Sequence, residues 1–175
     1  MPPDAVSYTR EDLLDIAALA AVGRAERVGR QRQIRAVVGE GATVADDARL
    51  RRLVERCLLV AAPRSAVGFQ VGMIGLARLH RFVRSPVGSA RGATHLGEEC
   101  ALRRVVLDVI DAPDRDEIVA LACADLVALR DGVLSCAFAE TCRSGACPLA
   151  AAARVEEIDL ALVWLAGADG AEGRA

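Results

Sequence analysis

The chain contains no lysine and no asparagine, so all 22 of its basic residues are arginines. The absence of lysine excludes Schiff-base chemistry, a lysine general base and the phosphate-binding lysine of a P-loop. A GC-rich genome is an alternative explanation for the missing residues. Histidine is scarce as well, since His80 and His95 are the only two. A metal site built from several histidines of one chain is therefore excluded.

Aromatic residues make up only 3% of the sequence, with one tryptophan, Trp164, and one tyrosine, Tyr8. Aromatic platforms for stacking bases or sugars are nearly absent as a result. The apolar fraction is nevertheless 53% of 175 residues, so a sizeable core must consist mainly of Leu, Val, Ala and Ile. Because Ala, Leu and Arg favour helices, whereas sheets favour β-branched and aromatic residues, the composition predicts a mostly helical protein.

Long uninterrupted apolar runs are also missing. The most apolar stretch, Cys57 to Leu79, is broken by Pro63 and Arg64, and each part is too short to span a bilayer. Residues 1–10 are polar and lack the apolar core of a secretory signal peptide. We therefore expect a cytoplasmic protein that does not enter membranes. In a reducing compartment its six cysteines should bind metal, be redox-active or be buried rather than form disulfides.

Negative charge is absent from the segment Arg56 to Gly97, which contains six arginines and no Asp or Glu. Residues 1–97 carry a net charge of +6 and residues 98–175 a net charge of -8, within a total of -2. One interpretation is an anion-binding surface formed by Arg78, Arg81 and Arg84, with nucleic acid or an acidic protein as partner. The simpler interpretation is that these arginines pair with acids of the C-terminal half.

Capping residues and apolar spacing predict about six helices with short connections. Thr9 with Asp12, Thr43 with Asp46, and Asp114 with Glu117 have the spacing of helix starts. We expect helices at about residues 9–38, 43–62, 65–83, 95–110, 114–131 and 148–166. The predicted fold class is all-α, with about six helices in a compact bundle or orthogonal array. Residues 1–166 should form a single helical domain, and residues 167–175 a disordered tail.

The third predicted helix carries Gly68, Gly72 and Gly75. Glycines on one helix face allow another backbone to approach closely. We expect this face to pack against a second helix, either within the bundle or across a homodimer. In the preceding helix, Cys57 should lie on the apolar face.

Three cysteines lie close together in the pattern Cys136-x5-Cys142-x4-Cys147. A loop containing Gly145 can bring the three thiolates to one centre, and thiolates are the preferred ligands of iron–sulfur clusters and Zn²⁺. Because the pattern lacks the C-x2-C pairs of zinc ribbons, an iron–sulfur cluster is favoured and zinc is the alternative. The nearest fourth ligand is Cys123, followed by Cys100, His95 or a carboxylate. Redox-reactive thiols and inert buried cysteines remain alternatives.

One segment contains Leu134-Ser-Cys136…Cys142-Arg-Ser-Gly-Ala-Cys147-Pro-Leu149 and is followed by an amphipathic helix that includes Trp164. This segment resembles the cysteine cluster tail of Rrf2-type iron–sulfur transcriptional regulators. In that family three closely spaced cysteines hold a cluster that senses nitric oxide, redox state or cluster supply. The segments 63–65 and 81–84 resemble the family's recognition helix and the start of its wing. The family's Gly-Gly-Tyr wing motif is missing from this chain.

Our main hypothesis from the sequence is an iron–sulfur or metal-binding helical sensor or regulatory protein that contacts nucleic acid. One alternative is a helical oligomerising interaction or accessory protein without a metal centre. Another is an enzyme that uses reactive cysteines, and the sequence does not decide whether the protein is an enzyme.

Overall fold

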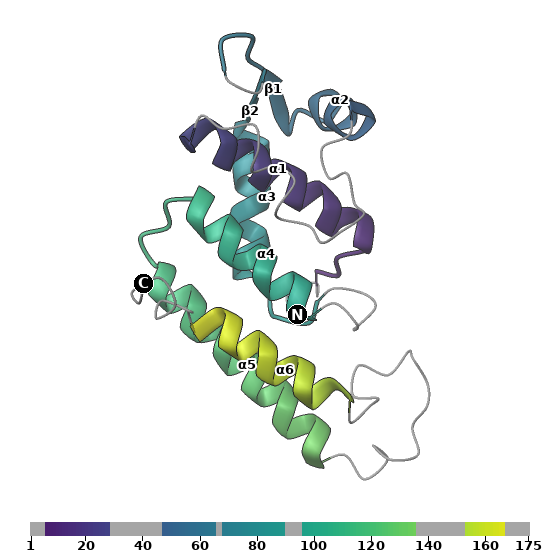
Figure 1. Ribbon diagram of the computed structural model, residues 1–175, viewed down its shortest axis with the longest axis vertical. Helices are drawn as coiled ribbons and strands as arrows, with labels where there is room; N and C mark the ends of the chain where they lie inside the picture. The colour runs from purple at the N-terminus through teal and green to yellow at the C-terminus, as the bar shows by residue number, and fades with distance from the viewer. Residues whose placement is uncertain (1–5, 29–46, 66–67, 90–95, 136–152, 167–175) are drawn as a thin grey trace, which may run out of the picture. The chain divides into compact units, whose positions relative to one another are not determined.

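The computed structural model describes residues 6–28, 47–65, 68–89, 96–135 and 153–166. Helices dominate these residues, which confirms the all-α prediction, and two short strands form a small hairpin (Figure 1). The elements in chain order are α1 (Arg10–Val28), α2 (Asp47–Glu55), β1 (Leu59–Ala61), β2 (Phe69–Val71), α3 (Met73–Arg84), α4 (Leu96–Val109), α5 (Arg115–Ser135) and α6 (Ala153–Ala166).

The described residues divide into two compact units. Unit 1 comprises residues 6–9, 86–89, 96–104, 114–135 and 153–166, and unit 2 comprises residues 10–28, 47–65, 68–85 and 105–113. Helix α4 contributes its first part to unit 1 and its last part to unit 2. A single domain over residues 1–166 stays a prediction, and the predicted tail over 167–175 lies outside the described residues.

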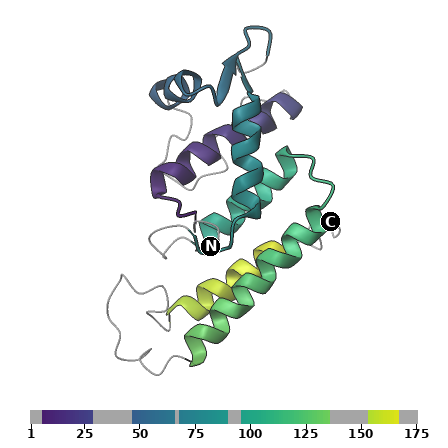
Figure 2. The same ribbon diagram turned by 180° about the vertical axis from the view of Figure 1, so that it is seen from behind.

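Helix α1 forms the core of unit 2. Every residue from Ile16 to Gly23 is buried, as expected for a helix that is apolar on all sides. The helix packs against α2, β2 and α3. In both views α3 crosses α1, and α2 and β2 lie toward the top (Figures 1 and 2). Small residues make this close packing possible. A methyl group on Gly23, for example, would lie 2.5 Å from Cγ1 of Val109.

The predicted helix over residues 43–62 is wrong in its second half, because α2 ends at Glu55. Cys57 has a positive φ of 59°. Its N–H donates to the Val54 carbonyl (2.9 Å), and the Leu58 N–H donates to the Leu53 carbonyl (2.9 Å). These two bonds around a left-handed residue form a Schellman motif, which closes a helix by satisfying its last carbonyls. Cys57 is therefore exposed beyond the helix end and does not lie on an apolar helix face.

The predicted helix over residues 65–83 is wrong in its first part, where the chain forms an antiparallel hairpin. Leu59 pairs with Val71, and Ala61 pairs with Phe69. The loop closes through Gly68, whose φ of +77° suits glycine. Helix α3 begins only after the hairpin, at Met73.

The glycines expected on one helix face therefore have different roles. Gly68 lies in the hairpin loop, Gly72 caps α3, and Gly75 lies within α3. The close approach that Gly72 and Gly75 permit involves the chain entering the hairpin, not a second helix. The Gly72 N–H donates to the Leu58 carbonyl (3.0 Å), and a β-carbon at Gly75 would collide with that same carbonyl oxygen.

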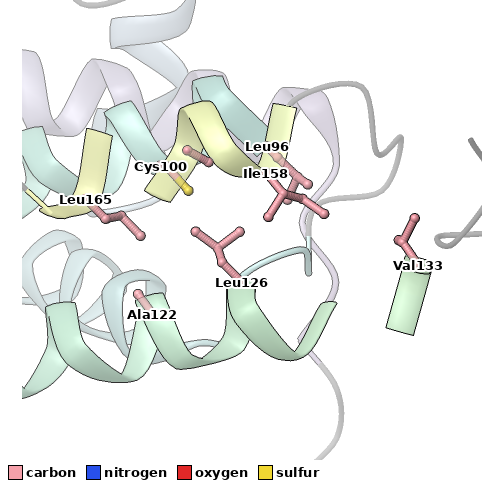
Figure 3. Packing of buried hydrophobic residues seen from close by; sticks show 8 residues of the cluster. Leu96, Cys100, Ala122, Leu126, Val133, Ile158 and Leu165 are labelled. Atoms are coloured by element: carbon pink, nitrogen blue, oxygen red, sulfur yellow. The ribbon is translucent and has the colours of Figure 1, made fainter. Parts of the chain in front are cut away.

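In unit 1, α5 and α6 lie side by side (Figure 1). Their predicted positions agree with the structure, although α5 continues past Gly132 to Ser135 and α6 is described only from Ala153. Their facing sides form an apolar cluster with the start of α4 (Figure 3). The buried members of this cluster are Leu96, Cys100, Ala122, Leu126, Val133, Ile158, Ala161 and Leu165.

Within the described ranges, no helix has both the length and the apolar character needed to cross a membrane.

Candidate functional site

Helix α2 is held against α1 by one face. Arg49 is buried, and its guanidinium donates to Oδ1 of Asp15 (2.6 Å) and to Oε2 of Glu11 (3.0 Å). Leu53, one turn further on, is completely buried. The buried Leu53 side chain and the ion pairs of Arg49 with two acids of α1 therefore fix the rotation of α2 about its axis.

This rotation directs two other arginines outward. Arg51 and Arg52 are both exposed. Because successive residues turn by about 100° around a helix, Arg51 lies opposite the face of Arg49 and Leu53, and Arg52 lies at its edge. Glu55, on the same side, is exposed as well. Arg51 and Arg52 were not among the predicted site residues. The signal that identifies them is the helical spacing of Arg49 and Leu53, which marks the buried face.

The hairpin follows α2 directly and contacts it through β1 (Figure 2). One face of the hairpin is exposed at the cross-strand pair formed by Val60 and Gln70. Arg64 is exposed in the loop between the strands. Helix α2 and the hairpin thus form a continuous structure with arginines at both ends, and we call residues 47–71 the α2–hairpin surface.

The arginines of the acid-free segment are partly neutralised within unit 2. Arg78 donates to Oδ1 of Asp12 (3.0 Å), and Arg56 donates to Oδ2 of Asp15 (3.0 Å). Their partners therefore lie on α1, not in the C-terminal half of the chain as expected. Of the predicted anion-binding set, Arg78 is engaged in an ion pair, while Arg81 and Arg84 are exposed in the last turn of α3.

Unit 1 contains a buried polar network between α4 and the segment preceding it. Arg103 donates to Oε1 of Glu99 (2.8 Å), and both residues are almost completely buried. Arg103 also donates to the Pro86 carbonyl (3.1 Å), and the Gly88 N–H donates to Oε2 of Glu99 (3.3 Å). Because both buried charges of this network have a partner, the network anchors residues 86–88 and needs no ligand.

The three clustered cysteines, Cys136, Cys142 and Cys147, lie outside the described residues, so their predicted metal site stays a prediction. Among the residues that are described, no group of three or more His, Cys, Asp or Glu side chains is placed to hold a metal ion. His95 also lies outside the described residues.

Cys123 and Cys100 lie in or against the apolar cluster of unit 1, where the Cys100 sulfur points toward the neighbouring apolar side chains (Figure 3). Burial, with a smaller contribution from the nearby Glu99 carboxylate, raises the pKa of Cys100 to about 12. Burial also raises the pKa of Cys123. Both thiols therefore stay protonated at neutral pH, a state that disfavours nucleophilic reaction.

The position of Cys123 on α5 also argues against its proposed role as a fourth ligand. It lies twelve residues before Ser135, the end of the helix, which corresponds to about 18 Å along the helix axis. Cys136 follows Ser135 directly. This separation favours a ligand set without Cys123.

Two segments singled out by resemblance have other roles in the structure. Residues 63–65 lie in the hairpin loop, and residues 81–84 form the last turn of α3. In this structure the helix that directly precedes the hairpin is α2. A comparison with protein-family models, curated proteins and solved structures finds no match. The resemblance to Rrf2-type regulators therefore stays a prediction.

Proposed function

We propose that this chain is a nucleic-acid-binding regulatory protein that contacts duplex DNA through its α2–hairpin surface. The observation that carries the proposal is the orientation of α2. Its buried face is fixed by Arg49 and Leu53, so Arg51 and Arg52 project outward next to a two-stranded ribbon.

The shape and chemistry of this surface suit duplex DNA. The major groove admits an α-helix or a two-stranded β-ribbon, and arginine binds both phosphates and guanine edges. In unit 2, Phe82 is buried and Phe69 is partly buried, so these rings do not offer the exposed stacking platforms typical of single-strand binding. The duplex is therefore the favoured nucleic-acid partner.

We place the regulatory input in the cysteine-rich segment 136–147. Three thiols within twelve residues support an iron–sulfur cluster, with zinc as the alternative. When bound, a cluster would supply a redox- or gas-sensitive centre. Cys136, Cys142 and Cys147 are the residues that would hold it.

DNA binding is tested by fluorescence anisotropy with a random-sequence duplex over a range of salt concentrations. Each arginine–phosphate contact adds roughly 0.9 to the slope of log affinity against log salt. The double variant Arg51→Ala/Arg52→Ala should lower that slope by about 1.8 if each arginine contacts one phosphate, and its thermal stability should be retained, because both side chains are exposed.

The control is Arg115→Ala/Arg130→Ala, which removes two half-buried positive charges from α5 in unit 1 and breaks the Arg130–Asp159 ion pair. Its slope should equal that of the unaltered protein. No binding at micromolar protein in low salt, or an equal loss of slope in both double variants, would contradict the proposal.

Metal binding is tested by anaerobic purification followed by iron, sulfide and zinc analysis. A cluster predicts a brown protein with broad visible absorption, whereas zinc predicts a colourless one. Each of Cys136→Ala, Cys142→Ala and Cys147→Ala should lose metal, whereas Cys57→Ala and Cys123→Ala should keep it. Equal metal content in all five variants would exclude the three-cysteine site.

A further inference from the structure

The side of α6 that faces away from the apolar cluster exposes three apolar residues together with two acids, Glu156 and Asp159. Ile158, Ala161 and Leu165 are buried against α5 and α4. On the outward side, 60% of Leu160, 65% of Val163 and 52% of Trp164 are exposed. An exposed tryptophan beside two exposed aliphatic residues on one helix is typical of a binding surface, because aromatic anchors carry much of the energy of interfaces.

Charged groups of opposite sign lie near the two ends of these apolar residues, and Asp159, between them, pairs with Arg130 of α5. Near the N-terminal end, Glu156 is exposed in the first turn of α6. At the C-terminal end, the Arg104 guanidinium donates to the Trp164 carbonyl (2.8 Å) in an exposed position. The acid and the guanidinium are thus separated by two turns of helix, with the apolar residues between them.

We propose that this chain forms a homodimer in which α6 packs antiparallel against α6 of a second copy. In a two-fold arrangement centred near Leu160, each Leu160 meets its equivalent, because such an interface uses the same surface patch on both subunits. Residue 156 of one copy then lies opposite residue 164 of the other. Glu156 of one copy then faces Arg104 of the other copy. That Arg104 is hydrogen-bonded to the Trp164 carbonyl of its own chain.

The same arrangement is favoured by the helix dipoles. In antiparallel helices the negative C-terminal end of one lies beside the positive N-terminal end of the other. Three apolar residues of α6 are exposed on this face, against roughly 20–30 residues a side in a standard interface. We therefore expect dissociation in the micromolar range. The inference concerns unit 1 alone and does not depend on DNA binding by unit 2.

Charge reversal provides the test, measured by sedimentation equilibrium from about 1 to 100 µM, the range expected for a small interface. The unaltered chain should be dimeric at the upper end of this range. Glu156→Arg and Arg104→Glu should each be monomeric, because each places like charges opposite one another. An equimolar mixture of the two variants should dimerise again, since every facing pair in the mixed dimer has opposite charges.

Leu160→Asp should also abolish the dimer, and Leu121→Asp is its matched control. Leu121 has the same residue type and the same exposed fraction, 60%. Arg130 pairs with Asp159 and so marks the side of α5 that faces α6. Leu121 precedes Arg130 by two and a half helical turns and therefore lies on the opposite side of α5. Circular dichroism establishes that each variant is folded. A monomeric unaltered chain, a mixture of folded variants that does not dimerise, or a Leu160→Asp dimer would each overturn the proposal.

Discussion

Cys57 adopts a backbone conformation that glycine tolerates better than any other residue. Its φ of 59° lies in the left-handed region, which costs a residue with a β-carbon roughly 1–2 kcal/mol. The Schellman bonds of residues 57 and 58 and the burial of Leu58 and Leu59 hold it there. A single residue thus determines where α2 ends and where the hairpin begins.

Substitutions at this position should follow backbone preference. Cys57→Gly should keep or raise the free energy of unfolding, because relief of the left-handed strain offsets the greater entropy of glycine in the unfolded chain. Cys57→Val should lower it by about 1 kcal/mol, since a β-branched residue is least suited to positive φ. Urea denaturation measures both. A large loss with Gly and none with Val would show that the helix end is held by another contact.

Among the elements, α3 depends on a close approach to the entrance of the hairpin. The Leu58 carbonyl lies so near Gly75 that a β-carbon there would collide with it, and this neighbour is backbone that cannot rotate away. Gly97, on α4, has open space where its β-carbon would be. The two helical glycines therefore differ in environment and provide a matched pair.

Gly75→Ala should lower the free energy of unfolding by about 1–3 kcal/mol, the cost of forcing extra volume into a packed site. Gly97→Ala should leave it unchanged or raise it by up to about 1 kcal/mol, because alanine is the better helix former. Thermal or urea denaturation of both variants makes the comparison. A stabilising Gly75→Ala would mean that α3 and Leu58 are not in contact.

The elements differ in how well sequence predicts them. Helices α4, α5 and α6 follow from capping residues and apolar spacing, which are local signals. The hairpin does not, because the run Leu58 to Ala62 suits a helix as well as a strand. The positive φ that ends α2 falls on Cys57, so no glycine in the sequence indicates that the helix ends there. The alternation in Phe69-Gln-Val71 was the available signal for a strand. The outward direction of Arg51 and Arg52 follows from the sequence only once Arg49 is known to share the buried face with Leu53, because ion pairs with α1 hold Arg49 there.

For the whole molecule, the uneven charge along the chain does not require the two halves to neutralise each other. The acids of α1 pair with Arg49, Arg56 and Arg78 inside unit 2, and Glu99 pairs with Arg103 inside unit 1. In these pairs neutralisation is local, and composition alone could not show which arginines take part. Arg51, Arg52 and Arg64 remain exposed on the α2–hairpin surface.

Hydrogen exchange of the full chain, measured by mass spectrometry with and without a short random-sequence duplex at low salt, tests the proposed function most directly. The account predicts slower exchange across α2 and the hairpin, residues 47–71, when duplex is added, and a return to the free rates when salt is raised. Exchange in α5 and α6 should not change. Duplex binding with unchanged exchange in residues 47–71, or with protection only in α3, α5 or α6, would contradict it.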